Sequence, residues 1–142
     1  MKASRKSEGK QSVKSLMHIC IINKSLYSCI SNEIDSVDVI ITSERIEHLS
    51  TKHPFDSSLL KKIEDALLNP DYILRGNMPL TGVVFKRIEV ENKFIEIVLR
   101  IHITSDGKGF SNSIITCMQI SEKRAMRYLR TKEILYKRSN PM

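Results

Sequence analysis

The segment from Phe94 to Ile103 constrains the fold of this chain more than any other part of the sequence. Successive side chains of a β-strand point to opposite sides of the sheet. The residues at one set of alternate positions include Glu96, Arg100 and His102. The residues at the other set are all aliphatic: Ile95, Ile97, Leu99, Ile101 and Ile103. The alternation therefore predicts a strand with one side in a core and the other on a half-polar surface.

The spacing of apolar residues changes along the chain from a helical to an extended period. Residues 43–68 have the spacing of two helices separated by Pro54, and residues from 71 onward mostly have the spacing of strands. A hydroxyl of Thr42 or Ser43 can cap the first helix, and Ser57 or Ser58 can cap the second. The expected strands are residues 17–22, 27–30, 37–42, 72–74, 83–90, 94–103, 113–120 and 134–136, with a helix capped by Ser121 before the last of them.

These elements predict a single α+β domain. N-terminal helices are expected to pack on a four- to five-stranded antiparallel sheet, with a short helix near the C-terminus. The 142 residues can bury one core and are too few for two domains of ordinary size. We divide the chain into a flexible basic tail (residues 1–15), an N-terminal strand and connector (16–36) and a folded domain (37–138).

Positive charge is concentrated at the two ends of the chain. The formal net charge is +7, and residues 1–24 and residues 122–142 each contribute +5 around a centre of −3. This distribution favours a polyanionic partner, of which nucleic acid is the commonest. The alternative is that the basic ends serve only solubility.

Several classes of protein are excluded by features that the sequence lacks. Its longest apolar runs, such as Ile19–Ile22, have about four residues, so no membrane-spanning segment is expected. It has no phosphate-binding glycine loop, no nucleophile elbow and no zinc-ligand spacing. Cys20 and Cys117 lie within apolar runs, which indicates reduced, buried thiols and action in the cytoplasm. We expect neither a metal nor a cofactor.

His53 is the first candidate for proton transfer. It follows a predicted helix and precedes Pro54, which holds it at an exposed edge. A histidine pKa of about 6.5 suits either an acid or a base near neutrality. Cleavage of RNA needs only such groups and cations, because the ribose 2′-OH is the nucleophile. The alternative is a histidine that interacts only with the helix dipole.

Cationic and hydroxyl side chains on the strands are further candidates. Arg100 and His102 share one side of their strand, and hairpin pairing brings either Lys86 or Arg87 near Arg100. Thr116 interrupts an apolar strand and could donate a hydrogen bond to a phosphate oxygen. All of them also fit an ordinary solvated or packed sheet. The last helix adds cations that could follow a phosphate backbone or simply be solvated: Lys123, Arg124, Arg127 and Arg130.

Short motifs follow one another in a characteristic order between residues 37 and 138: Lys52-His53-Pro54, Asn69-Pro70-Asp71-Tyr72, Phe85-Lys86-Arg87-Ile88, Val98-Leu99-Arg100-Ile101 and Asn112-Ser113-Ile114-Ile115-Thr116. This order resembles the barnase–EndoU–colicin–RelE superfamily of metal-independent ribonucleases, in particular small domains carried by phages and mobile elements. The resemblance implies a barnase/RelE-like fold that binds RNA on the open face of its sheet.

The resemblance also implies which residues surround the scissile phosphate. It nominates His53, either Lys86 or Arg87, Arg100 and Thr116. Simple alternation places Thr116 on the side of residues that look like core, so a bulge is needed, and Ser113 is the substitute. His102 is added from the strand pattern and not from the resemblance.

We therefore expect a toxin-like endoribonuclease, with catalytic residues His53, Lys86, Arg100, Thr116 and Ser113. The expected RNA-binding residues are Arg87, His102, Lys123, Arg124, Arg127 and Arg130. RNA, with transfer RNA as one option, is the expected substrate, and an acidic immunity or antitoxin protein is the expected inhibitor. The alternative function is a non-catalytic basic module that binds RNA or protein.

Overall fold

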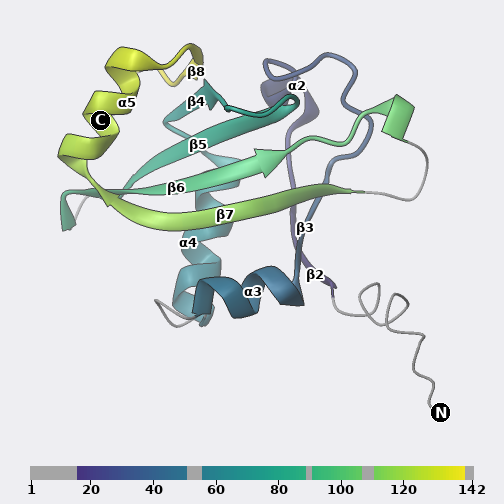
Figure 1. Ribbon diagram of the computed structural model, residues 1–142, viewed down its shortest axis with the longest axis horizontal. Helices are drawn as coiled ribbons and strands as arrows, with labels where there is room; N and C mark the ends of the chain where they lie inside the picture. The colour runs from purple at the N-terminus through teal and green to yellow at the C-terminus, as the bar shows by residue number, and fades with distance from the viewer. Residues whose placement is uncertain (1–15, 51–55, 89–90, 107–110, 140–142) are drawn as a thin grey trace.

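The computed structural model describes residues 16–50, 56–88, 91–106 and 111–139 of the chain. Within these residues, seven strands form one mixed sheet in the order β2-β3-β7-β6-β5-β4-β8 (Figure 1). The strands are β2 (Leu16–Ile21), β3 (Asp38–Thr42), β4 (Tyr72–Arg75), β5 (Thr81–Ile88), β6 (Lys93–Arg100), β7 (Asn112–Ser121) and β8 (Ile134–Lys137). The helices are α2 (Lys24–Tyr27), α3 (Ser43–Ser50), α4 (Ser57–Leu68) and α5 (Glu122–Thr131), and a 3₁₀ turn η2 spans Thr104–Asp106.

The predicted four- to five-stranded antiparallel sheet is wrong. Two strands from the first third of the chain, β2 and β3, extend the sheet at one edge, and β8 forms the other edge. The sheet is mixed because β3 runs parallel to β7, with Val39 opposite Asn112 and Ile40 opposite Ser113. All other neighbouring strands are antiparallel. Pairing between segments more than seventy residues apart leaves no mark in the local pattern, so the sequence did not predict it.

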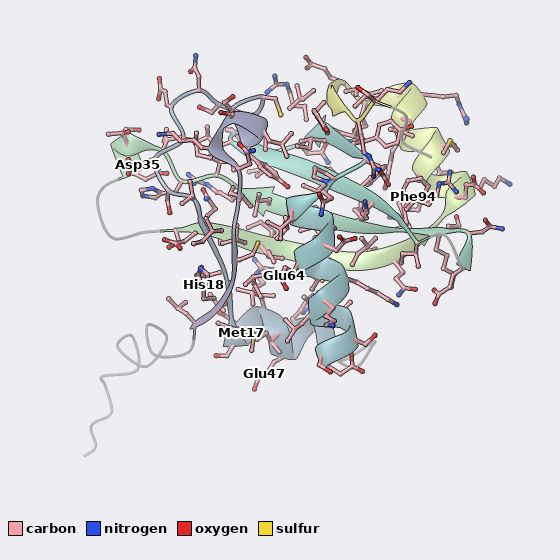
Figure 2. The ribbon with its side chains drawn as sticks, turned by 180° about the vertical axis from the view of Figure 1, so that it is seen from behind. Met17, His18, Asp35, Glu47, Glu64 and Phe94 are labelled. Carbon is pink, nitrogen blue, oxygen red and sulfur yellow. The ribbon has the colours of Figure 1, made fainter. Side chains whose placement is uncertain are left out.

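The helices lie on both faces of the sheet. Helix α4 packs on one face, which is turned toward the viewer in Figure 2. Helix α5 packs on the opposite face, at the end of the hairpin formed by β5 and β6 (Figure 1). We call these the α4 face and the α5 face. Helices therefore cover both faces of the sheet, and the α5 face is covered only at one end (Figure 1).

Side chains at the helix starts explain where the helices begin. Helix α3 follows Thr42, whose hydroxyl accepts a hydrogen bond from the backbone N–H of Arg45, as the sequence predicted. Helix α5 follows Ser121, whose hydroxyl accepts from the N–H of Arg124. Helix α4 is capped by Asp56 and not by the expected Ser57 or Ser58.

Residues 27–30 do not form the expected strand. Asn23 accepts a hydrogen bond from the N–H of Leu26 and starts the short helix α2. Tyr27, at the end of α2, is fully buried and donates its hydroxyl to the carbonyl of Leu67 in α4. The β-branched and aromatic composition of this segment thus serves packing and not strand pairing.

Two apolar clusters stabilise the sheet. The larger one fills the space between the α4 face and helices α2 to α4, and it includes Cys20 and Cys117. Both are free thiols, and burial raises the pKa of each to about 11, which agrees with the predicted reduced, buried state. The smaller cluster lies under α5 and includes Phe85, Phe94 and Ala125. The described residues contain no helix that is long and apolar enough to cross a membrane.

Candidate functional site

The register of the central strands decides which candidate residues share a face. Residues directly opposite each other in neighbouring strands project to the same side of a sheet. Arg100 of β6 lies opposite Thr81 of β5 and Ser113 of β7. These three side chains therefore form a row across the α5 face.

A β-bulge in β7 brings Thr116 to the same face. The register between β6 and β7 shifts between Val98 and Leu99, so that Thr116 lies opposite Val98 and Ile114 lies opposite Leu99. Ile114 is buried in the cluster on the α4 face, whereas Thr116 projects from the α5 face. The bulge that the sequence required for Thr116 is present, and Arg100, Ser113 and Thr116 share a face.

Lys86 lies on the opposite face from Arg100. It is opposite Ile95, whose side chain is in the core beneath α4. Its ammonium group lies 3.9 Å from the buried carboxylate of Asp71, which also forms an ion pair of 3.0 Å with Arg138. The predicted grouping of Lys86 with Arg100 does not occur. Lys86 is five positions along β5 from Thr81, the partner of Arg100, and side chains an odd number of positions apart on a strand project to opposite faces.

Arg87 is on the α5 face, but at the other end of the strand. It lies opposite Phe94, and its guanidinium carbon is 4.7 Å from the centre of that ring. One terminal nitrogen donates to Glu122 at a distance of 3.0 Å. The structure therefore places Arg87 beside the start of α5, at the opposite end of β5 from Thr81, the partner of Arg100.

Two of the candidate histidines do not contribute to the described geometry. His53 lies outside the described residues. His102 is only 3% exposed, and its ring nitrogen Nδ1 is 3.6 Å from a carboxylate oxygen of Asp35. The structure thus places His102 inside the protein and not on a surface that RNA can reach.

Arg100 is held by an acidic partner in η2. Its two terminal nitrogens lie 3.2 and 3.4 Å from the two carboxylate oxygens of Asp106, and one of them also donates to the carbonyl of Ile101. Hydrogen bonds from Arg100 and from the backbone of Ile103 hold the pKa of Asp106 below its ordinary value. The Arg100 side chain is 39% exposed, so an anion can reach it while Asp106 fixes its direction.

Helix α5 carries the predicted cluster of cations on its exposed side. Arg124 donates to the hydroxyl of Tyr128 one turn later, and this hydrogen bond raises the pKa of the guanidinium. The exposed cations of the helix are Lys123, Arg124, Arg127 and Arg130. Their only acidic neighbour within the helix is Glu122, which is paired with Arg87, so this side of α5 has a strong excess of positive charge.

A cavity of about 570 Å³ lies beside α5, on the same face as Arg100. Apolar residues of β4, β5, β6 and the loop before β5 form most of its wall. Its polar lining includes Glu96 and Arg100 of β6, together with Tyr128 and Lys132 at the end of α5. Lys132 also donates to the side chain of Asn77 at 2.6 Å, which ties the loop between β4 and β5 to the end of α5.

Glu96 is a functional candidate that the sequence reasoning did not single out. It is 9% exposed, and no described residue donates a hydrogen bond to its carboxylate or forms an ion pair with it. Burial raises its pKa, while the charges of Arg124 and Lys132 act in the opposite direction. The sequence did contain one signal for this residue. Glu96 is the one acidic residue on the side of the predicted strand that also carries Arg100.

Replacing Glu96 with glutamine is expected to stabilise the fold at neutral pH and not in acid. Burial raises the pKa of Glu96 in the folded state, so the protonated carboxyl group favours folding. This contribution to the free energy of unfolding is complete below the unfolded-state pKa and is lost as the pH rises through the folded-state pKa. Glutamine does not ionise and avoids this loss. Melting temperatures at pH 7 and below about pH 4 test the difference.

The matched control is Glu122→Gln, which removes a half-exposed carboxylate that is paired with Arg87. This variant is expected to show no gain in melting temperature at neutral pH. A gain of equal size at both pH values for Glu96→Gln would contradict an ionisation effect.

Neither metal chemistry nor known relatives identify the site. Among residues 16–50, 56–88, 91–106 and 111–139, no group of His, Cys, Asp and Glu side chains could hold a metal ion. No protein-family model, curated protein or solved structure matches the chain. The function is therefore inferred from the geometry and charge of the α5 face.

Proposed function

We propose that the chain is a metal-independent endoribonuclease that binds RNA on the α5 face. The observation that supports this most is the grouping of Arg100 with the hydroxyls of Ser113 and Thr116, beside a cavity and a cationic helix. A guanidinium and hydroxyl groups are the donors that a phosphodiester requires when its negative charge increases during displacement.

The proposed reaction is an internal transesterification. The ribose 2′-oxygen forms a bond to phosphorus and loses its proton to a general base, while the bond from phosphorus to the 5′-oxygen breaks and that oxygen takes up a proton. The products are a 2′,3′-cyclic phosphate and a free 5′-hydroxyl. No metal is needed, because the substrate itself supplies the nucleophile.

Each side chain has a distinct role in this proposal. Arg100 stabilises the charge of the pentacoordinate phosphorane, and Ser113 or Thr116 donates a hydrogen bond to a phosphate oxygen. His53 keeps the role of general acid or base that the sequence assigned to it. Lys86 is removed from the set because it projects from the α4 face.

The cations of α5 are proposed to bind phosphates on either side of the cleaved bond. Contacts of this kind strengthen binding without regard to sequence and weaken as the salt concentration rises. An acidic protein that covers Lys123, Arg127 and Arg130 would compete with RNA for the same surface. Free, buried thiols agree with action in the cytoplasm.

Incubation of the pure protein with total RNA, with and without EDTA, tests the proposal. We expect discrete fragments that carry a 2′,3′-cyclic phosphate at one end, in equal yield with and without the chelator. Loss of cleavage in EDTA would indicate a metal-dependent nuclease. Salt-dependent RNA binding with no fragments would instead support a non-catalytic binding module, which the exposed cations of α5 also favour.

A further inference from the structure

A second cavity, of about 340 Å³, lies on the α4 face where α4 ends, and Lys86 lines it. We call it the Lys86 cavity. Its walls come from α2, the end of α4, β5 and the end of β8. The sequence singled out Lys86 as a cation, and the proposed reaction leaves it without a role. Because this cavity and Arg100 lie on opposite faces of the sheet, ligand binding here does not rest on the proposed function.

The ammonium group of Lys86 has no hydrogen-bond acceptor within the described part of the chain. The Lys86 side chain is only 17% exposed, and the carboxylate of Asp71 lies 3.9 Å from the ammonium nitrogen, which is too far for a hydrogen bond. An ammonium group has three N–H donors, and a mostly buried charge is costly without acceptors. An acceptor bound in the cavity would therefore stabilise this charge.

Asp71 is already bound to other donors. One of its carboxylate oxygens accepts from the backbone N–H of Arg87 at 2.7 Å, and the other accepts from the guanidinium of Arg138 at 3.0 Å. Lys86 and Arg138 thus share the charge of a single carboxylate, which leaves one positive charge in excess at the cavity wall. Their nitrogens lie 3.9 and 3.0 Å from the same oxygen of Asp71, so one bound oxyanion can contact both cations.

The end of α4 limits how much negative charge a ligand can carry. Asp65, in the last turn of α4, lines the cavity and accepts a hydrogen bond from the side chain of Asn69 at 3.3 Å. The last carbonyl groups of α4 are also the negative end of the helix dipole. A ligand with a single negative charge can bind at the cations, whereas a second negative charge would be repelled by Asp65.

The rest of the wall suits a small apolar group. Leu26 of α2, together with Leu68 and Pro70 at the end of α4, forms the apolar part of the lining. The volume of about 340 Å³ lies at the lower end of the range of roughly 300–1,000 Å³ that is usual for small-molecule sites. The cavity therefore has room for a small organic molecule with one charged end.

We propose that the Lys86 cavity binds a small organic monocarboxylate. Its carboxylate contacts Lys86 and Arg138, and its apolar part packs against Leu26 and Leu68. The carboxylate supplies the acceptor that Lys86 lacks and balances the excess positive charge. Tyr136, which also lines the cavity, adds a hydroxyl group as a further donor.

Nuclear magnetic resonance titration of the full ¹⁵N-labelled chain at constant ionic strength tests this site, with butyrate, butyramide, succinate and phosphate as probes. We expect butyrate to shift the backbone amide signals of Asn69, Lys86 and Arg138 with a saturating dependence on concentration. Succinate and phosphate are expected to bind at least tenfold more weakly, and uncharged butyramide is expected to cause no saturating shift. No saturating shift with butyrate, or equal affinity for butyrate and any other probe, would overturn the proposal.

Two lysine variants locate the carboxylate. Lys86→Met keeps the length and apolar stem of the side chain, and Arg138 still pairs with Asp71, so the fold is expected to survive. This variant is expected to bind butyrate at least tenfold more weakly. Lys61→Met is the matched control, because Lys61 is exposed on α4 and does not line the cavity. Equal affinity of the Lys86 variant and the unchanged protein for butyrate would refute the role of Lys86.

Asp65→Asn tests the preference for a single charge with a readout that loss of folding cannot imitate. Asp65 is exposed, and asparagine keeps its size, so the fold is expected to survive. We expect this variant to gain more affinity for succinate and phosphate than for butyrate, because the repelling charge is gone. Unchanged relative affinities for the three anions would refute the role of Asp65 in excluding a second charge.

Discussion

Replacing Arg100 with alanine is expected to lower the rate of RNA cleavage by about 100-fold to 1,000-fold. This is the usual effect of removing one donor that stabilises charge in a transition state. The guanidinium is partly exposed and its main partner is Asp106, so the fold is expected to survive the substitution. Initial rates on a labelled single-stranded oligoribonucleotide, with the melting temperature measured in parallel, provide the test.

Lys86→Ala is the matched control for this prediction. It removes the same unit of positive charge from the neighbouring strand, but on the opposite face of the sheet. Its cleavage rate is expected to stay within a few-fold of the unchanged protein. Equal losses for both variants would mean that overall charge, and not the grouping on the α5 face, determines the rate. Full activity of Arg100→Ala would remove Arg100 from the mechanism.

Arg100→Lys separates charge from geometry. Lysine keeps the positive charge but lacks the planar fork with which arginine binds two oxygens at once. A rate between those of the alanine variant and the unchanged protein is expected. Recovery of the full rate would show that a point charge at this position is sufficient.

The sequence predicted most individual elements because their signals are local. The alternation of apolar residues in Phe94–Ile103 predicts a strand whatever its neighbours in the sheet are. Ser121 caps α5 through a hydrogen bond within the first turn of the helix. The number and order of strands was not predicted correctly. The parallel pairing of β3 with β7 depends on contacts between distant segments, and a short strand such as β2 has no feature that reveals its partner.

The grouping of the candidate residues on one face was predicted in part, and the misplacement of Lys86 has a simple physical cause. The face to which a strand residue projects depends on register, and a shift of one residue reverses it. The sequence could not tell whether Lys86 or Arg87 shares a face with Arg100, and the register of β5 with β6 assigns Lys86 to the other side. The same sensitivity explains Thr116, which reaches the α5 face only because of the bulge in β7.

The cavity was beyond prediction from the sequence because separate segments build it. Glu96 comes from β6, Leu74 from β4, and Tyr128 and Lys132 from the end of α5. Each of these residues has an ordinary structural explanation when it is considered alone. Only the packing of α5 over the sheet shows that a buried carboxylate and a cation face a common space.

Replacing Asn112 with alanine is expected to destabilise the fold by about 3 kcal/mol, the largest stability effect that we predict for a single polar side chain. Asn112 is completely buried at the point where β3 and β7 run parallel. Its amide oxygen accepts from the N–H of His102 at 2.7 Å, and its amide nitrogen donates to the carbonyls of Ser36 and Asp38 at 2.6 and 3.0 Å. Alanine leaves these three backbone groups without their partner, at a cost of about 1 kcal/mol or more for each.

Urea unfolding at fixed temperature measures this effect, with Asn69→Ala as the matched control. Asn69 is exposed, and within the described part of the chain its side chain donates only to Asp65, at 3.3 Å. Its loss is therefore expected to cost less than about 1 kcal/mol. A loss of about 3 kcal/mol is a large fraction of the stability of a domain of this size. Equal midpoints for the two variants would mean that water or a shifted backbone satisfies the groups that Asn112 now joins. A larger loss for Asn112→Ala would show that this one amide holds the N-terminal strands on the sheet that carries Arg100, Ser113 and Thr116.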